Sequence, residues 1–337
     1  MAVLPLSKRR RAAMVLTMTL LLCDVGGTFV RFALKRQGGL MTVPQKFRAA
    51  NYPVFEEAAR HFLASFGMPP DDISALGLAF AGRNTWQITQ ESVAALLPRA
   101  MFCKINDFEA NAYGVLDISE EGLFSLNVVS PRKDQNFRKT KCVVGPGTGL
   151  GLAYIHEGPE GQIIQKTHGG HMLPACLGED STLLFRNLAA LRSDGTIPIY
   201  EDVVSGPGLY NLYRVFASQS HLRVEYRDAH EMLAKGRNDP LVIQSLKVFH
   251  EWLGIFVHQA VAFGNSYGGV YLTGGIMDKL VSLDLFDPLT FFGAFYQKNV
   301  PIVMEDVWAT PVYWIRDEYI SLRGLCTRLE TITKGAS

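Results

Sequence analysis

The stretch Leu22-Cys-Asp-Val-Gly-Gly-Thr-Phe-Val-Arg-Phe-Ala33 places an acidic residue, two glycines and a threonine between two apolar runs. Two adjacent glycines permit a sharp turn and let backbone N–H groups approach a ligand closely. Such N–H groups bind phosphate oxygens. The residues after Thr28 continue as a second β-prone run, so we predict a strand–turn–strand hairpin. A dinucleotide-binding fold needs a helix there, and a Walker loop needs a Gly-Lys-Ser/Thr ending. An ordinary hairpin turn is the alternative when this stretch is read alone.

Two further segments repeat the theme. Lys141-Cys-Val-Val-Gly-Pro-Gly-Thr-Gly-Leu-Gly-Leu-Ala-Tyr-Ile155 is again β-prone, glycine-rich and β-prone, and its glycines do not fit G-x-G-x-x-G. Gly269–Asp278 reads as a buried strand that runs through Gly274-Gly275 into a helix, whose N-terminus can face a nucleotide. The ordered trio predicts a clamp for nucleotide phosphates in a duplicated architecture.

A fourth segment carries groups suited to an acceptor hydroxyl. Asn106-Asp107 follows the apolar run that begins at Phe102. Open α/β sheets place their sites at the carboxyl ends of parallel strands. A carboxylate there can act as a general base for an acceptor hydroxyl. The structural alternative is that Asn106-Asp107 only caps the helix that follows.

Taken together, these motifs resemble the bacterial glucokinase family, within the superfamily of hexokinase, actin and Hsp70 ATPases. The resemblance covers roughly residues 20–315 in the family's order. It implies an α/β, two-domain actin-like ATPase (ribonuclease H-like) fold with a cleft between the domains. It also implies phosphorylation of glucose to glucose 6-phosphate by ATP with Mg²⁺, and a homodimer. The matching stretches are Asp24–Arg31, Ile105–Phe108, Gly145–Gly151, Gly169–His171, Glu201–Arg214 and Leu272–Ile276.

The resemblance also implies roles for individual residues. Asp107 matches the catalytic aspartate, which takes the proton of the sugar hydroxyl. Asp24 would hold Mg²⁺ through water. The implied sugar-binding residues are Asn106, Asp107, His171 and Glu201, with His168 and Asn84 as further candidates, and the implied ATP-binding residues are Asp24, Gly26, Gly27, Thr28, Arg31, Gly147, Thr148, Gly149, Gly274 and Gly275.

Two departures from the family pattern leave the substrate open. The family has a glutamate where this chain has His168, and losing a charged acceptor removes a hydrogen bond worth roughly 1.5–3 kcal/mol. The segment Ala79–Trp86 is also shorter than in the family. Alternatives are therefore a kinase of another hexose and a weakly catalytic sugar-sensing homologue. A structural zinc at His168, His171 and Cys176 is disfavoured because no fourth ligand follows at a recognisable spacing.

Composition bounds the remaining classes. The 337 residues are 48% hydrophobic, enough for two cores, and 33 basic residues balance 32 acidic ones. No global field therefore draws the chain to nucleic acid or to a membrane. The five cysteines form no C-x-x-C pair, so we expect a reduced, cytoplasmic compartment.

The domain organisation follows from the same segments. Residues 1–19 are expected to be a flexible basic leader, because the apolar run from Ala12 to Cys23 is too short to span a membrane and supplies the first strand. A small domain is expected over 20–118 plus 305–337, and a large domain over 119–304. We expect a loop over 130–140, helices over Val54–Phe66, Glu91–Leu97, Glu109–Leu116 and Pro240–Phe263, and a strand over Ile73–Ala81. The segment Pro311–Ile315 is expected to be a strand or the entry to a helix.

Overall fold

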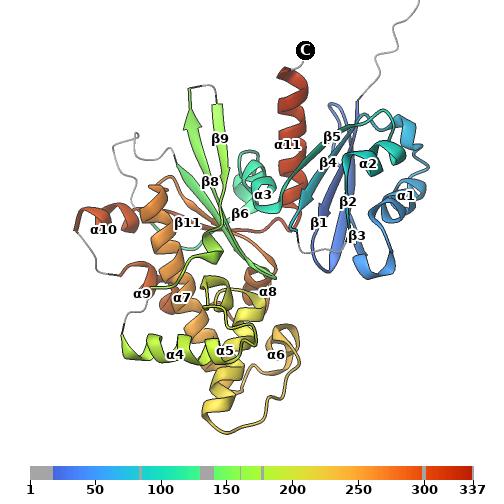
Figure 1. The fold of residues 1–337 in the computed structure, drawn as a ribbon. Coiled ribbons are helices and arrows are strands. Elements are labelled where there is room, and N and C mark those ends of the chain that lie inside the picture. The colour runs from blue at the N-terminus through green and yellow to red at the C-terminus, as the bar shows by residue number, and fades with distance from the viewer. Residues whose placement is uncertain are drawn as a thin grey trace, which may run out of the picture.

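The computed structural model describes residues 18–82, 86–129, 140–159, 161–175, 178–297 and 301–335. Its strands form two sheets, and each sheet is the centre of one lobe (Figure 1). None of the helices in the described ranges is long and apolar enough to cross a membrane.

The first sheet is mixed and has the order β3-β2-β1-β4-β5. Strands β1, β4 and β5 are parallel, whereas β2 is antiparallel to both of its neighbours. The near-continuous apolar run of β1 fits this central position, where helices cover both faces. The strands are β1 (Thr19–Val25), β2 (Phe29–Arg36), β3 (Gln45–Arg48), β4 (Ala75–Phe80) and β5 (Met101–Asn106).

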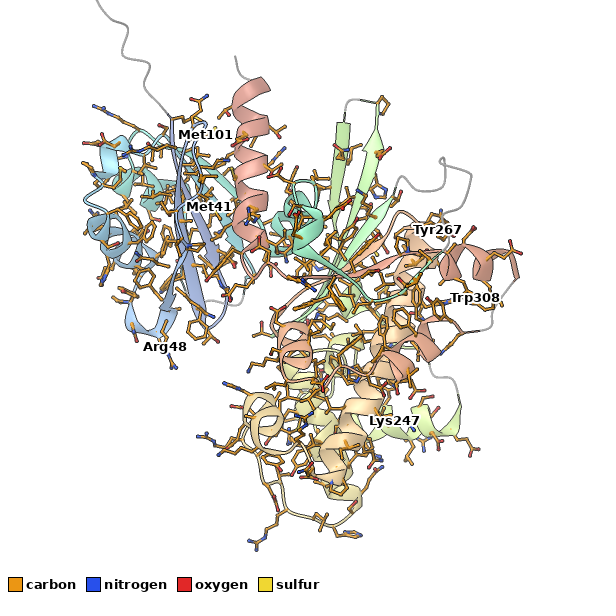
Figure 2. All side chains as sticks on the ribbon, turned by 180° about the vertical axis from the view of Figure 1, so that it is seen from behind. Met41, Arg48, Met101, Lys247, Tyr267 and Trp308 are labelled. Atoms are coloured by element: carbon orange, nitrogen blue, oxygen red, sulfur yellow. The ribbon has the colours of Figure 1, made fainter. Side chains whose placement is uncertain are left out.

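Helices cover the two faces of this sheet. On one face, α1 (Phe55–Ser65) and α2 (Gln90–Leu96) pack on a cluster centred on Phe32 and Phe62. On the other face, α11 (Ile320–Gly335) packs its Leu325 and Leu329 on β1 and β4. Figure 2 shows the molecule from behind, and in this view Met41 and Met101 lie beside α11.

The helix α3 (Asp107–Val115) lies between the two sheets (Figure 1). Its Ala110 belongs to the hydrophobic cluster formed by α11 and the first sheet. Its Ala112 belongs to a second cluster, formed with strands of the second sheet. A Cβ at Gly324 of α11 would lie 1.7 Å from the carbonyl oxygen of Ala110. Glycine at position 324 therefore allows α3 and α11 to touch backbone to backbone.

The second sheet has the order β6-β11-β10-β7-β8-β9. Strands β7, β10 and β11 are parallel, and β8 and β9 extend the sheet as an antiparallel meander. The strands are β6 (Leu123–Ser125), β7 (Lys141–Pro146), β8 (Leu150–Gly158), β9 (Gly161–Lys166), β10 (Val270–Leu272) and β11 (Val312–Ile315).

The core of the second lobe forms around the long helix α7 (Pro240–Gly264), which buries Phe249 and Phe256 against its neighbours. The other helices are α4 (Glu179–Ala190), α5 (Gly206–Gln219), α6 (Ala229–Lys235), α8 (Gly275–Ser282), α9 (Pro288–Phe295) and α10 (Pro301–Trp308). Short 3-10 turns are η1 (Ala49–Asn51), η2 (Pro70–Asp72), η3 (Glu120–Gly122), η5 (Gly169–His171) and η6 (Tyr200–Asp202).

The local elements expected from the sequence are present. Both predicted hairpins are antiparallel strand pairs, and the third glycine segment is a strand followed by a helix. The helix expected over Glu109–Leu116 begins earlier, at Asp107, because the side chain of Asn106 accepts the Phe108 N–H and so starts it. Residues 1–17 and 130–139, where a leader and a loop were expected, lie outside the described ranges.

The C-terminal segment differs from the expectation in one respect. Residues 305–337 were assigned to the small domain as a unit, but β11 pairs with β10 and β6 in the second sheet. Within that segment, α11 is the part that packs on the first sheet. The physical reason is that a short apolar strand can pair in either sheet, and its own sequence does not decide which one it joins.

Candidate active site

Three parallel strands of the first sheet end at the same level. The register pairs Val25 with Phe80 and Phe80 with Asn106. The turn after β1 and the segment Asn106-Asp107 after β5 therefore leave the same edge of the sheet, where open α/β sheets build their sites.

At this edge, Asp24 is paired with Arg31. Arg31 Nη1 lies 3.1 Å from Asp24 Oδ2 across the first hairpin. Burial raises the pKa of the Asp24 carboxyl above its usual range, and the charge of Arg31 and a hydrogen bond with Ser321 oppose that rise. Ser321 belongs to α11 and lies almost 300 positions further along the chain, so no pattern near Asp24 could have pointed to it.

The turn of the first hairpin is held by backbone bonds. The Gly26 N–H donates to the carbonyl of Phe29 at 3.0 Å, and the Ala49 N–H donates to the carbonyl of Thr28 at 3.0 Å. A Cβ at Gly26 would lie 3.2 Å from the Phe29 oxygen, so little space remains for a side chain. The turn therefore presents backbone rather than side chain at this position.

The second hairpin and the third glycine segment form one unit. The Thr273 N–H donates to the carbonyl of Val144 at 3.0 Å. Gly274 has a φ of +102°, and a Cβ there would lie 2.6 Å from the carbonyl oxygen of Pro146. Both the backbone conformation and this close approach require glycine at position 274.

Two other glycines of this unit have no such requirement. Neither Gly147 nor Gly275 has a positive φ. In the described parts of the chain, a Cβ at either position would meet no atom within 4 Å beyond its own neighbours. These residues border open space beside the turn of the second hairpin and the N-terminus of α8.

The loop before α4 packs its glycines on β8. A Cβ at Gly169 would lie 2.5 Å from the Leu152 side chain, and one at Gly170 would lie 2.1 Å from the Leu150 carbonyl. The imidazole rings of His168 and His171 stack at 5.7 Å between centroids. The two glycines thus let this segment pack directly on β8, with one exposed histidine on either side of them.

Glu201 joins this group from η6. Its Oε2 accepts a hydrogen bond from the Leu150 N–H at 2.8 Å and lies 3.9 Å from His171 Nε2. The Gly206 N–H, at the start of α5, donates to the carbonyl of Gly147 at 2.8 Å. Gly147 is therefore part of this turn, Glu201 is bonded at its end, and His171 lies beside Glu201 with His168 stacked on it.

Asn106 and Asp107 occupy the start of α3. Asn106 Oδ1 accepts the Phe108 N–H at 3.0 Å, so Asn106 is the helix N-cap and Asp107 is the first helical residue. The helix N-terminus favours a negative charge at position 107. The capping alternative thus applies to Asn106, whereas Asp107 is the first residue of the helix itself.

The metal and sugar predictions include two further residues. Asn84 and Cys176 lie outside the described ranges. Within the described ranges, no group of three His, Cys, Asp or Glu side chains is arranged to hold a metal ion. A carboxylate such as Asp24 supplies the hard oxygen ligand that Mg²⁺ uses together with substrate phosphates and water, so the donor chemistry fits that ion.

Two mixed sheets, each with a glycine hairpin and joined through α3 and α11, are the architecture of a sugar kinase with the actin-like ATPase fold. The sequence model of the glucokinase family matches residues 21–332. The chain belongs to the glucokinase family, and it is a hexose kinase.

Individual proteins agree with this assignment. The glucokinase of Chromohalobacter salexigens is 31% identical over 302 residues, which cover 84% of this chain and 89% of that protein. The glucokinase structure from an Antarctic psychrotroph has a TM-score of 0.73 at 23% identity and covers 93% of this chain and 99% of its own. The glucokinase of Balamuthia mandrillaris in complex with glucose has a TM-score of 0.75 at 19% identity, with 92% and 93% covered.

Proposed function

We propose that this kinase transfers the γ-phosphoryl group of ATP directly to a hydroxyl of glucose, giving glucose 6-phosphate, with Asp107 as the general base. The observation that carries the proposal is the meeting of acceptor and phosphate elements at the second hairpin. Glu201 accepts from Leu150 in that hairpin, and Asn106-Asp107 begins the helix that packs against it. In-line transfer requires this proximity of acceptor and donor sites.

The proposed ATP site uses both hairpins and the start of α8. Gly147 and Gly275 support it, because packing and backbone conformation do not require glycine there. A phosphate that approaches the backbone closely gives a reason for the missing side chains. The proposed residues are Asp24, Gly26, Gly27, Thr28, Arg31, Gly147, Thr148, Gly149, Gly274 and Gly275.

Mg²⁺ belongs to this proposal through Asp24. The carboxylate would hold the ion through water, and the bound ion would supply charge neutralisation for the phosphates. Arg31, 3.1 Å from Asp24, holds the carboxylate in place and adds a second positive charge at the same edge.

The proposed sugar site takes Asn106, Asp107, His171 and Glu201, with His168 and Asn84 as further candidates. Each buried sugar hydroxyl needs a partner, and these side chains offer carboxylate, amide and imidazole groups. His168 stacked on His171 stands where the family has a glutamate, and this favours one alternative, a kinase that prefers another hexose. The proposal also includes the two-domain division with a cleft that closes on the sugar, a homodimer and a cytoplasmic location.

The test is a coupled assay of ADP release with glucose, mannose, fructose and N-acetyl sugars. We expect the highest kcat/KM with glucose. Asp107→Asn should lower kcat by about 10²–10⁴-fold, the usual contribution of a general base. Asp117→Asn, a change at an exposed aspartate beyond the end of α3, is the matched control.

Each outcome of that assay has a meaning. No sugar-stimulated ADP release at millimolar sugar would favour the sensing homologue. Turnover with a different hexose and none with glucose would favour the alternative of a kinase for another hexose. Undiminished turnover in Asp107→Asn would remove Asp107 from the role of base.

A further inference from the structure

The second hairpin contains a seat for an aromatic ring. Gly145 and Gly151 are direct cross-strand partners in the β7–β8 pair. A Cβ at Gly145 would lie 2.5 Å from Cζ of Phe108, and one at Gly151 would lie 2.0 Å from Cε2 of the same ring. Any side chain at either position would displace the ring, so these two glycines are explained by Phe108.

Phe108 is also fixed at its backbone. Its N–H donates to Asn106 Oδ1 at 3.0 Å, and it directly follows Asp107 in the first turn of α3. On the far side of the same helix, a Cβ at Gly114 would lie 2.3 Å from the carbonyl oxygen of Ile320. The helix is therefore held on α11 while its first aromatic ring rests on the hairpin.

The turn of the hairpin is held from a second direction. The carboxylate of Glu201 accepts from Leu150 N, and the carbonyl of Gly147 accepts from Gly206 N, both at 2.8 Å. The turn is thus attached to η6 and α5 by hydrogen bonds and to α3 by the ring of Phe108. Of these contacts, the Phe108 ring is the one adjacent in sequence to the proposed base.

We propose that Phe108 is a positioning residue that sets the spacing between the Asp107 carboxylate and the phosphate-binding turn of the second hairpin. The inference rests on the proposed function of Asp107 and of that turn. It divides the glycines of the motif into two kinds: Gly145 and Gly151 make room for the ring, whereas Gly147 leaves room for the nucleotide.

The expected consequence is a change in turnover rather than in binding. A displacement of about 1 Å in the reacting groups can lower the rate by about 100-fold. Removing part of the ring lets α3 and the hairpin move relative to each other, while Glu201 and the glycine turn keep their own contacts. Loss of kcat with little change in KM is the signature of an interaction made in the transition state.

The experiment measures Phe108→Leu and Phe108→Ala in the full chain. We expect kcat for sugar phosphorylation to fall by about 10–100-fold, with the KM of each substrate changed less than about threefold. The slow hydrolysis of ATP without sugar does not use the Asp107–sugar geometry, so its rate should stay near that of the wild type. The ratio of hydrolysis to phosphorylation therefore rises.

Two comparisons separate positioning from a general loss of stability. Phe62→Leu makes the same change in the core of the first lobe, where Phe62 is fully buried, and should lower Tm without lowering kcat of the folded enzyme. Gly151→Ala should lower Tm, and adding Phe108→Ala should restore part of that loss because the ring no longer occupies the space. The double variant should not regain kcat.

The outcomes are distinct. A wild-type chain without sugar-stimulated turnover overturns the proposed function and this inference with it. An active wild type with unchanged kcat in both Phe108 variants overturns this inference alone. Equal losses of phosphorylation and of sugar-free hydrolysis assign Phe108 to ordinary packing and also overturn it. Strictly additive effects of Gly151→Ala and Phe108→Ala on Tm would show that the ring does not occupy the space beside Gly151, and this too overturns it.

Discussion

The carboxylate of Glu201 accepts a hydrogen bond from the backbone N–H of Leu150 at 2.8 Å. Glu201 lies in η6, and Leu150 is the first residue of the strand that leaves the second glycine hairpin. A side chain proposed to bind sugar is thus bonded to a loop proposed to bind ATP. This hydrogen bond connects the proposed sugar site with the proposed ATP site, so a substitution at one site should change binding at the other.

Replacing Glu201 should weaken the use of both substrates. Glu201→Ala leaves the N–H of the buried Leu150 without this acceptor, and a hydrogen bond to a charged group is worth roughly 1.5–3 kcal/mol. We expect the KM of sugar and of ATP both to rise in steady-state kinetics. Glu201→Gln keeps an oxygen acceptor and should retain the KM of ATP. The exposed Glu251→Ala is the control, and a change in sugar KM alone for Glu201→Ala would contradict a shared role.

Alanine substitutions should separate the glycines of the clamp. Gly147→Ala and Gly275→Ala introduce a methyl group into open space, so Tm should change little while the KM of ATP rises. Gly274→Ala combines a positive φ with a Cβ 2.6 Å from the Pro146 oxygen and should lower Tm. The exposed Gly293→Ala in α9 is the matched control and should be neutral or slightly stabilising. An unchanged KM of ATP in the first two variants would remove them from the nucleotide site.

Restoring the family's glutamate should strengthen sugar binding. His168 is exposed and stacks on His171, beside Glu201. His168→Glu adds a charged acceptor whose hydrogen bond is worth roughly 1.5–3 kcal/mol, so the KM of glucose should fall by about tenfold or more. The measurement is kcat/KM across the same sugar panel. His168→Gln, which adds a neutral acceptor, is the comparison, and a glucose KM that rises in His168→Glu would show that this chain is adapted to another sugar.

Stability should fall in mild acid because of His250. Its Nδ1 lies 2.7 Å from the Leu246 carbonyl, and its Nε2 accepts the Asp287 N–H. Burial lowers the pKa of His250 from 6.5 to about 4. The unfolded chain therefore binds the proton first, so the contribution is present above about pH 6.5 and is lost as pH falls towards 4. Its size is about 3 kcal/mol.

The measurement for His250 is the free energy of unfolding between pH 8 and pH 5. His250→Gln should be less stable than the wild type at pH 8, but its stability should decline less over this interval. The exposed His230→Gln serves as the surface control. An identical pH dependence in wild type and His250→Gln would assign the acid sensitivity to other groups.

The parts of the fold that the sequence predicted are those in which neighbours along the chain decide the structure. The two hairpins were predictable because glycine-rich turns separate β-prone runs, and α7 because its apolar residues recur at helical spacing. The prediction placed the start of α3 two residues late, because Asn and Asp are residue types found both at helix N-caps and in binding sites, and Asn106-Asp107 fits either. The sheet that β11 joins was not predictable from the four apolar residues of this strand.

For the candidate site, the sequence named side chains but not their partners. His171 and Glu201 were predicted for one site, and the structure places them 3.9 Å apart. The bond from Leu150 to Glu201 and the contact of Ser321 with Asp24 join segments far apart in the chain. Phe108 was part of a quoted motif, yet an aromatic residue after Asn-Asp gives no sign of which strand it will touch.

By itself the sequence determined the local features of the site: the turns that expose backbone, the strands beside them and the carboxylates near the ends of those strands. All of these depend on residues within a few positions of one another. The tertiary structure alone decided which of the glycines serve packing. Gly145 and Gly151 read the same as Gly147 in the sequence, but the ring of Phe108 covers the first two and leaves the third open. That difference arises from contacts between distant segments, which only the folded chain brings together.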